Sequence, residues 1–221
     1  MTLWAIVPVK PLRRGKSRLK GVLTEDERAE LNTNMLIHTL DTLVGLPELE
    51  HVLVVSRDPK ALSVARQHGA RTVQEDGRPH LNTALERATA VARSYGARQV
   101  LVLPADLPQL CRQDVQDILV LSQQSPMMVI APDYHGRGTN GLLLNPPGLI
   151  KYQFGQNSYE HHKQAARSKG MQVEVFERES LAHDVDLPQD LKYLDGQLPG
   201  WISKRHSTAD EVPEAEKIGN K

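Results

Sequence analysis

Apolar runs and amphipathic stretches alternate along the first half of the chain. The run Leu3–Val9 is rich in β-forming residues, and Pro8 near its end is typical of a buried strand that gives way to a loop. Thr24, with Glu27 at capping-box spacing, predicts the start of a helix whose apolar stripe continues to about Val44. This segment is therefore predicted to be a strand, a loop and a helix.

The same alternation then repeats. Strands are expected at residues 52–55, 71–73 and 100–103, and helices at 60–68, 81–95 and 112–123. Strands that are apolar on both faces and joined by helices are typical of a parallel sheet covered by helices. This half of the chain therefore predicts an α/β fold.

The pattern changes after Gln124. A strand at 127–131, a glycine-rich turn at 136–138 and a second apolar run at 141–144 predict a hairpin-like insertion. A helix at 158–168, a strand at 172–176 and a short helix after Asp186 complete the pattern. The complete pattern predicts an α/β fold with a mixed, mostly parallel sheet flanked by helices.

Residues 1–198 are expected to form one domain. Residues 199–221, which are poor in apolar side chains, are expected to form a largely disordered tail.

Composition narrows the classes of partner. The chain of 221 residues has 27 basic and 27 acidic side chains, so its net charge favours neither a nucleic acid nor an anionic membrane. No stretch approaches the roughly 20 apolar residues of a membrane span, and no signal-peptide pattern is present, so a cytoplasmic protein is expected. The single cysteine, Cys111, is expected to be buried and inert.

A cationic loop follows the first predicted strand. Five of the nine residues from Lys10 to Arg18 are basic, at a strand end where α/β proteins bind ligands. The triplet 15–17, Gly-Lys-Ser, matches the end of a phosphate-binding P-loop, but that motif needs a glycine at position 10. The loop is therefore predicted to bind phosphates without being a P-loop, the alternative being a solvated basic turn.

Two acidic segments follow other predicted strands. Asp106 lies between Pro104 and Pro108, which stiffen its loop, and Asp184 and Asp186 share one side of an extended segment. Magnesium usually takes one or two protein carboxylates and completes its octahedron with water and substrate phosphates. The segments therefore predict a magnesium site for a nucleotide, although Asp106 alone could equally be a helix cap.

Other catalytic arrangements are disfavoured. His161 and His162 are adjacent, and neighbouring helical residues point about 100° apart, so they are unsuited to binding one ion and are interpreted as surface or pocket-rim residues. No Ser-His-Asp pattern or nucleophile elbow is present, which argues against acyl transfer.

Short motifs in a fixed order make the chain resemble a known family. The motifs are Pro8-Val9-Lys10, Gly15-Lys16-Ser17-Arg18-Leu19, Leu81-Asn82-Thr83-Ala84-Leu85, Ala105-Asp106-Leu107-Pro108, Gly138-Thr139-Asn140, Phe154-Gly155-Gln156-Asn157-Ser158 and Asp184-Val185-Asp186. Across most of residues 3–195 the chain resembles the 2-phospho-L-lactate guanylyltransferases, a family that includes the phosphoenolpyruvate guanylyltransferases of coenzyme F420 biosynthesis. The resemblance implies a glycosyltransferase-A-like nucleotidyltransferase fold that binds GTP and Mg²⁺ and releases pyrophosphate.

The resemblance also implies a role for individual residues. Carried onto this sequence, the site residues are Asp106, Asp184 and Asp186 for the metal, Lys10, Lys16 and Arg18 for the triphosphate, and Thr139, Gly155 and Ser158 for a phosphorylated three-carbon acid. Lys10, Lys16 and Asp106 are expected to be catalytic. Asn82 is expected either to contact GTP or to cap its helix. Ser158 is expected to open a helix, where its hydroxyl and free backbone N–H groups form an anion site.

The reaction implied is attack by the phosphate oxygen of the acid on the α-phosphorus of GTP. The nucleophile is already anionic, so catalysis reduces to positioning and charge neutralisation. The sequence leaves open whether the acid is 2-phospho-L-lactate, phosphoenolpyruvate or 3-phosphoglycerate, and whether the chain forms a homodimer. The alternatives are a related enzyme with another nucleoside triphosphate or acceptor, a sugar transferase of the same fold, and a non-catalytic nucleotide-binding module.

Overall fold

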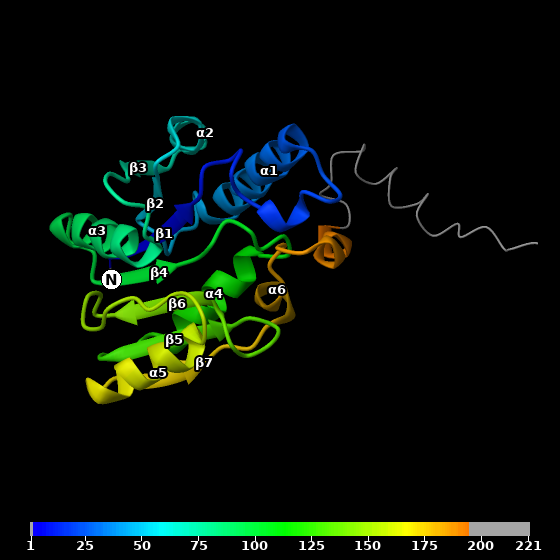
Figure 1. Ribbon diagram of the computed structural model, residues 1–221. Helices are drawn as coiled ribbons and strands as arrows, with labels where there is room; N and C mark the ends of the chain where they lie inside the picture. Colours follow the sequence, from blue (N-terminus) through cyan, green and yellow to red (C-terminus); the bar gives the residue numbers. More distant parts are fainter. Residues whose placement is uncertain (1, 195–221) are drawn as a thin grey trace, which may run out of the picture.

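A seven-stranded sheet forms the centre of the computed structural model, which describes residues 2–194 (Figure 1). Its strands lie in the order β3-β2-β1-β4-β6-β5-β7. Their bounds are β1 Leu3–Val9, β2 His51–Ser56, β3 Arg71–Gln74, β4 Gln99–Val102, β5 Met127–Pro132, β6 Thr139–Asn145 and β7 Gln172–Val175. Every strand predicted from the sequence is present. The predicted domain end at 198 and the tail at 199–221 lie outside the described residues.

The strand directions confirm a mixed, mostly parallel sheet. β1 pairs in parallel with β2 and β4, β2 with β3, and β5 with β7. Among the described strands, β6 alone runs in the opposite direction, antiparallel to both β4 and β5. The hairpin-like insertion predicted after Gln124 is therefore the antiparallel β5–β6 pair in the interior of the sheet.

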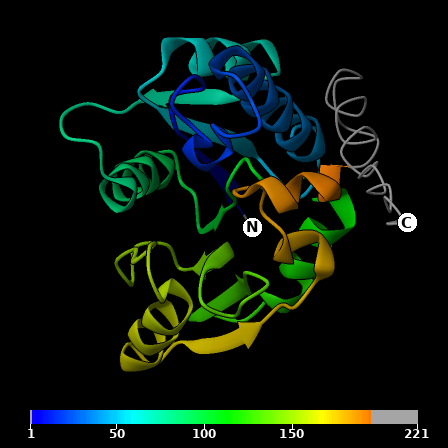
Figure 2. The ribbon, with the colours of Figure 1, turned by 45° about the vertical axis from the view of Figure 1, so that its right-hand side comes forward.

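Helices cover both faces of the sheet. Their bounds are α1 Glu25–Leu43, α2 Pro59–Gln67, α3 Leu81–Ser94, α4 Arg112–Leu121, α5 Ser158–Ser168 and α6 Glu179–Ala182, with 3₁₀ helices η1 Ser17–Leu19 and η2 Pro188–Leu194. Figure 2 shows α3 and α5 on the left of the sheet and α1, α4 and α6 on the right. Two separate apolar clusters correspond to these two faces. The molecule therefore has three layers.

Strand β1 shows why its sequence is apolar throughout. Ala5 and Val7 pack into the cluster below α1 and α4, whereas Trp4 and Ile6 pack into the cluster below α3. Successive side chains of a strand point to opposite faces, so a strand covered on both sides needs apolar residues at every position.

The first helix begins as predicted. Thr24 Oγ1 accepts a hydrogen bond from the Glu27 N–H at 3.3 Å, and Glu27 Oε2 accepts one from the Thr24 N–H at 2.7 Å. The two elements that the sequence analysis did not predict, η1 and α6, span three and four residues. Such short helices complete at most one turn, so a helical period leaves little trace in their sequence.

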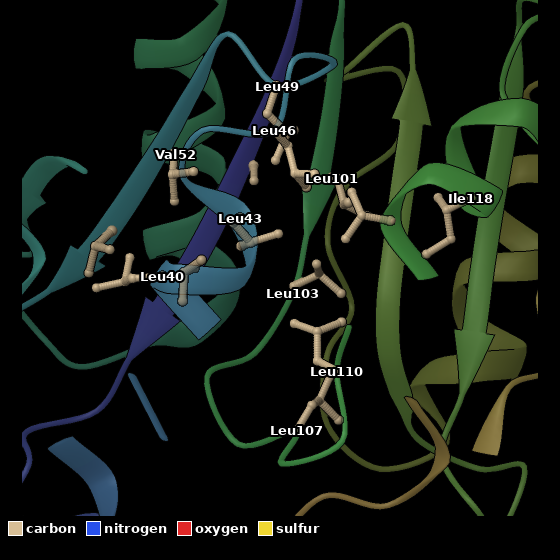
Figure 3. Packing of buried hydrophobic residues seen from close by; sticks show 14 of the residues in the cluster. Leu40, Leu43, Leu46, Leu49, Val52, Leu101, Leu103, Leu107, Leu110 and Ile118 are labelled. Carbon is tan, nitrogen blue, oxygen red and sulfur yellow. The ribbon is translucent and has the colours of Figure 1, made fainter. Parts of the chain in front are cut away.

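The loop after β4 is anchored from below. Figure 3 shows Leu107 and Leu110 of this loop pointing towards Leu103 at the end of the strand, in the same cluster as side chains of α1. Both leucines are 1% exposed, and each such burial stabilises the fold by about 1.5–3 kcal/mol. The carboxylate of Asp106, directly before Leu107, therefore sits on a fixed segment.

Two further expectations concern exposure. Cys111 was predicted to be buried, and this is wrong: the residue is exposed and occupies the N-cap position of α4. The buried position at this turn is taken by Leu110 instead. Between residues 2 and 194, none of the helices combines the length and apolar character needed to cross a bilayer.

Candidate active site

The predicted site residues converge because of the strand directions. β1 and β4 are parallel, so the loops carrying Lys16 and Asp106 leave the sheet at the same edge. β6 is antiparallel and therefore begins at that edge, which places Thr139 there. The segment carrying Asp184 and Asp186 follows β7 and α6 at the same edge (Figure 1). Residues more than 150 positions apart thus meet at one end of the sheet.

A cavity of about 640 Å³ lies at this edge. Most of the predicted site residues line it, namely Lys10, Lys16, Asp106, Thr139, Gly155, Ser158, Asp184 and Asp186. Arg18 and Asn82 are not among its lining residues. The volume is within the range of about 300–1,000 Å³ typical of small-molecule sites.

Three carboxylates form a cluster in the cavity. Oxygen atoms of Asp106, Asp184 and Asp186 lie within 4.8 Å of one another. Val185 is fully buried among apolar side chains, so the residues on either side of it point to the opposite, open side. The Val185 N–H also donates to the Asp106 carbonyl at 3.1 Å, which joins the two acidic segments.

Two polar side chains hold the second acidic segment in place. Asn140 donates its amide to the Leu181 carbonyl at 2.8 Å and approaches Asp184 Oδ1 at 3.5 Å. Asp190 accepts from the N–H of Asp186 at 3.0 Å and from the N–H of the following residue at 2.6 Å. Asn140 belongs to a motif noted in the sequence, whereas Asp190 was missed because a side chain that only bonds to local backbone carries no distinctive motif.

Lys16 lies among these carboxylates rather than out in its loop. Its Nζ is 2.7 Å from Asp106 Oδ2 and 3.3 Å from Asp186 Oδ1, and the side chain is 5% exposed. Burial disfavours the ammonium form, but the attraction of Asp106 and Asp186 outweighs burial and raises the pKa of Lys16. Arg18 contacts Asp186 at 3.2 Å from the exposed side.

One ammonium does not neutralise three carboxylates. Burial, followed by repulsion from Asp106 and Asp186, raises the pKa of Asp184 to about 6, although Lys16 lowers it. A cluster with surplus negative charge and clustered oxygen donors suits a hard divalent cation, which would favour the ionised form of every member. The three carboxylates can therefore hold a metal ion.

The backbone of the cationic loop is constrained. Lys16 adopts the left-handed conformation, with φ 53° and ψ 40°, which is uncommon for a residue other than glycine and costs about 1 kcal/mol or more. A Cβ on the preceding Gly15 would lie 2.7 Å from Asn32 Nδ2, and that amide donates to the Leu12 carbonyl at 2.6 Å. Gly15 therefore leaves room for the Asn32 amide, which bonds to the loop that brings Lys16 to the carboxylates.

Thr139, Gly155 and Ser158, the residues predicted to bind the acid, also line the cavity. Ser158 was predicted to offer free backbone N–H groups at a helix start, and this is wrong in part. The N-cap of α5 is Asn157, and the Ser158 N–H donates to the Gly155 carbonyl at 3.2 Å. The Tyr159 N–H is likewise bonded to a loop carbonyl. The group that remains at this position is the Ser158 hydroxyl.

Asn82 makes a contact that the sequence analysis did not predict. Its Nδ2 donates to the Phe154 carbonyl at 3.1 Å, and its Oδ1 accepts from the Phe154 N–H at 2.8 Å. The N-cap of α3 is His80, so Asn82 is not the cap. Both polar atoms of the amide contact the Phe154 backbone, so Asn82 anchors the loop that carries Gly155. Its contact with GTP stays a prediction.

His162 is the residue whose position differs most from expectation. Predicted to lie on the surface or pocket rim, it is fully buried beneath Thr139, with Nδ1 3.2 Å from Thr139 Oγ1. The Gln153 N–H donates to its Nε2 at 2.9 Å. Burial, with a smaller effect from His161, lowers the pKa of His162 to about 4. Helical spacing offered a signal that was not used, because His162 lies four residues from both Ser158 and Ala166, the other buried residues of α5.

The buried imidazole predicts acid sensitivity. In the unfolded chain His162 takes up a proton near pH 6.5, but in the folded protein only near pH 4, so stability is lost as the pH falls through this window. The loss is about 3 kcal/mol. Urea unfolding of wild type and His162→Gln between pH 7 and 4 measures it. The raised pKa of Asp184 acts in the opposite direction in both proteins, so the difference between the curves isolates His162. Parallel curves would contradict the prediction.

The family assignment rests on similarity along nearly the whole chain. Residues 3–196 match the family model described as guanylyl transferase CofC like. The chain is 44% identical over 195 residues to a phosphoenolpyruvate guanylyltransferase of Rubrobacter xylanophilus, with 88% of this chain and 94% of the relative covered. It is 34% identical to a 2-phospho-L-lactate guanylyltransferase of Methanothermobacter thermautotrophicus, with 86% and 83% covered.

Solved structures agree on the fold. A protein from Desulfovibrio desulfuricans G20 assigned to the nucleotide-diphospho-sugar transferases superposes with a TM-score of 0.75 at 18% identity, covering 95% of this chain and 96% of that one. A nucleotidyl transferase from Methanothermobacter thermautotrophicus gives a TM-score of 0.63 at 16% identity, covering 89% and 97%. The predicted glycosyltransferase-A-like nucleotidyltransferase fold is thus confirmed, and the chain belongs to the CofC-like guanylyltransferase family.

Proposed function

We propose that this protein transfers GMP from GTP to the phosphate of phosphoenolpyruvate or 2-phospho-L-lactate and releases pyrophosphate. The observation that carries the proposal is one cavity that joins a carboxylate cluster, the cations Lys10 and Lys16, and the hydroxyls of Thr139 and Ser158. The relatives named above act on these two acids, which both carry one carboxylate and one phosphate. 3-Phosphoglycerate, which has the same two groups, is a third candidate.

The proposed step forms one P–O bond and breaks another. A phosphate oxygen of the acid attacks the α-phosphorus of GTP, and the bond from that phosphorus to the bridging oxygen of pyrophosphate breaks. The attacking oxygen is anionic at neutral pH, so no side chain needs to remove a proton. Lys10 and Lys16 line the cavity and offset the charge of the triphosphate. The exposed Arg18, which contacts Asp186, adds to this charge. Thr139, Gly155 and Ser158 hold the acid.

The proposed cofactor is Mg²⁺, held by Asp106, Asp184 and Asp186. Besides burial, repulsion from Asp106 and Asp186 contributes to the raised pKa of Asp184, so the single buried ammonium does not offset the negative charge of the cluster. This uncompensated charge supports the binding of a cation. A hard divalent ion would supply charge neutralisation at the phosphates. The cationic residues and the Thr139–Ser158 wall of the cavity position GTP and the acid, respectively.

A pyrophosphate-release matrix tests the function. Four nucleoside triphosphates are combined with phosphoenolpyruvate, 2-phospho-L-lactate and 3-phosphoglycerate, with and without Mg²⁺. We expect release with GTP and one or two of the acids, and none when Mg²⁺ is removed by chelation. Equal release with CTP would favour a sibling nucleotidyltransferase, and no release in any combination would contradict the proposal. Product formation with phosphoenolpyruvate or 2-phospho-L-lactate would support a place in coenzyme F420 biosynthesis.

A further inference from the structure

The buried imidazole of His162 touches the wall of the cavity where the proposed acid binds. It contacts Thr139 Oγ1 on one side and the Gln153 N–H on the other, and Phe154 packs edge-on against its ring at 4.9 Å. Ser158 Oγ in turn donates to Thr139 Oγ1 at 3.0 Å. The mechanism proposed above does not use this histidine.

The Gln153 contact determines which nitrogen of the imidazole carries the proton. A backbone N–H can only donate, so Nε2, at 2.9 Å, must be the unprotonated acceptor. The neutral ring then carries its proton on Nδ1 and donates it to Thr139 Oγ1. In the other tautomer and in the imidazolium form, Nε2 carries a proton, so its N–H group would face the Gln153 N–H and no hydrogen bond would form.

The three side chains have one more proton than their contacts with each other use. His162 Nδ1 and the hydroxyls of Thr139 and Ser158 carry three protons, and the two contacts between them use two. With Ser158 donating to Thr139, the Thr139 oxygen accepts twice and its own proton is free to point into the cavity. Reversing that contact moves the free proton to Ser158 without removing it. If Nδ1 were an acceptor instead, no proton would remain.

We propose that His162 is a positioning residue that orients the Thr139–Ser158 hydroxyl pair as a hydrogen-bond donor to an anionic oxygen of the acid substrate. The inference rests on the proposed function, because it assigns the acid to this wall. A carboxylate or phosphate oxygen accepts such a proton, whereas an ammonium or amide N–H group does not. His162 thereby favours a ligand group that accepts a hydrogen bond, such as an anionic oxygen, without touching it.

The test compares two substitutions at one position. His162→Leu removes both contacts, whereas His162→Gln retains one acceptor and one donor in its amide. We expect Leu to raise the KM for phosphoenolpyruvate or 2-phospho-L-lactate by about tenfold, because the hydroxyl pair keeps one free proton but loses the N–H donor that fixes its direction. Gln should restore it to within about threefold, and the KM for GTP should change less than about twofold in both. His161→Leu, at the exposed neighbour, is the matched control and should behave as wild type.

A double-mutant cycle separates positioning from a structural effect. In a Thr139→Val background the receiving hydroxyl is absent, so His162→Leu should add less than about twofold to the KM for the acid. An equal effect of His162→Leu in both backgrounds, or equal rises in the KM for GTP and for the acid, would overturn the inference. Calorimetric titration with each acid gives the same comparison without turnover. Weaker acid binding by His162→Leu than by wild type would therefore support the positioning role even without turnover. A wild type that binds the acid but releases no pyrophosphate would contradict only the proposed function.

Discussion

Substituting Asp106 with alanine should reduce pyrophosphate release by about a thousandfold or more, since several kcal/mol of transition-state stabilisation depend on the metal site. Asp106 is one of three clustered carboxylates and also the nearer partner of Lys16. Its loss removes a proposed metal ligand and frees the ammonium from its shortest contact. The fold should persist, because the loop is held by Leu107 and Leu110 rather than by the carboxylate.

Two further variants serve as comparisons for Asp106→Ala. Asp106→Asn, which keeps the side-chain volume but removes the charge, should be nearly as inactive as Asp106→Ala. Glu174→Gln, at an exposed position of β7 outside the cluster and the cavity lining, also removes one negative charge and should leave the rate unchanged. Circular dichroism and thermal melting of each variant report the fold. Wild-type rates in folded Asp106→Ala at saturating Mg²⁺ would contradict the metal assignment.

The fold was predictable because its signals are local and repeated. Strand β1 is apolar at every position since both faces are covered, and Thr24 with Glu27 forms the capping box that the spacing indicates. The β5–β6 pair was visible as two apolar runs around a glycine-rich turn. What the pattern does not contain is the sheet order, in which β6 lies between β4 and β5. That order depends on contacts between strands that are distant in the sequence.

The site was predictable where it follows strand ends, and less so where it depends on packing. Asp106, Asp184 and Asp186 were identified because each follows a predicted strand region, and they do meet in space. Asn82 was recognised as part of a motif, but its clamp on Phe154 joins residues 72 positions apart. His162 was interpreted as a surface or pocket-rim residue, because the pair His161 and His162 is unsuited to binding one ion and suggested no other role.

Replacing Lys16 with methionine should lower kcat/KM for GTP by about a hundredfold, because a cation aimed at the charge of the transition state is removed. The same change should lower the Mg²⁺ concentration needed for half-maximal activity by several-fold. Lys16 Nζ lies 2.7 Å from Asp106 Oδ2 and 3.3 Å from Asp186 Oδ1. A divalent cation bound by the cluster would compete with the ammonium for these oxygens. Without the ammonium, the cluster holds three carboxylates with no buried ammonium among them.

These opposite movements distinguish the proposed role of Lys16 from general damage, since misfolding would weaken turnover and metal binding together. Lys20→Met is the matched control, because Lys20 is exposed at the end of the same loop and does not line the cavity. Titrating Mg²⁺ at fixed GTP and acid measures both quantities in one experiment. If the half-maximal Mg²⁺ concentration rises in Lys16→Met, the ammonium does not compete with the cation. Lys16 would then be a support that holds the carboxylates together, and the proposed contact with the triphosphate would rest on Lys10 and Arg18.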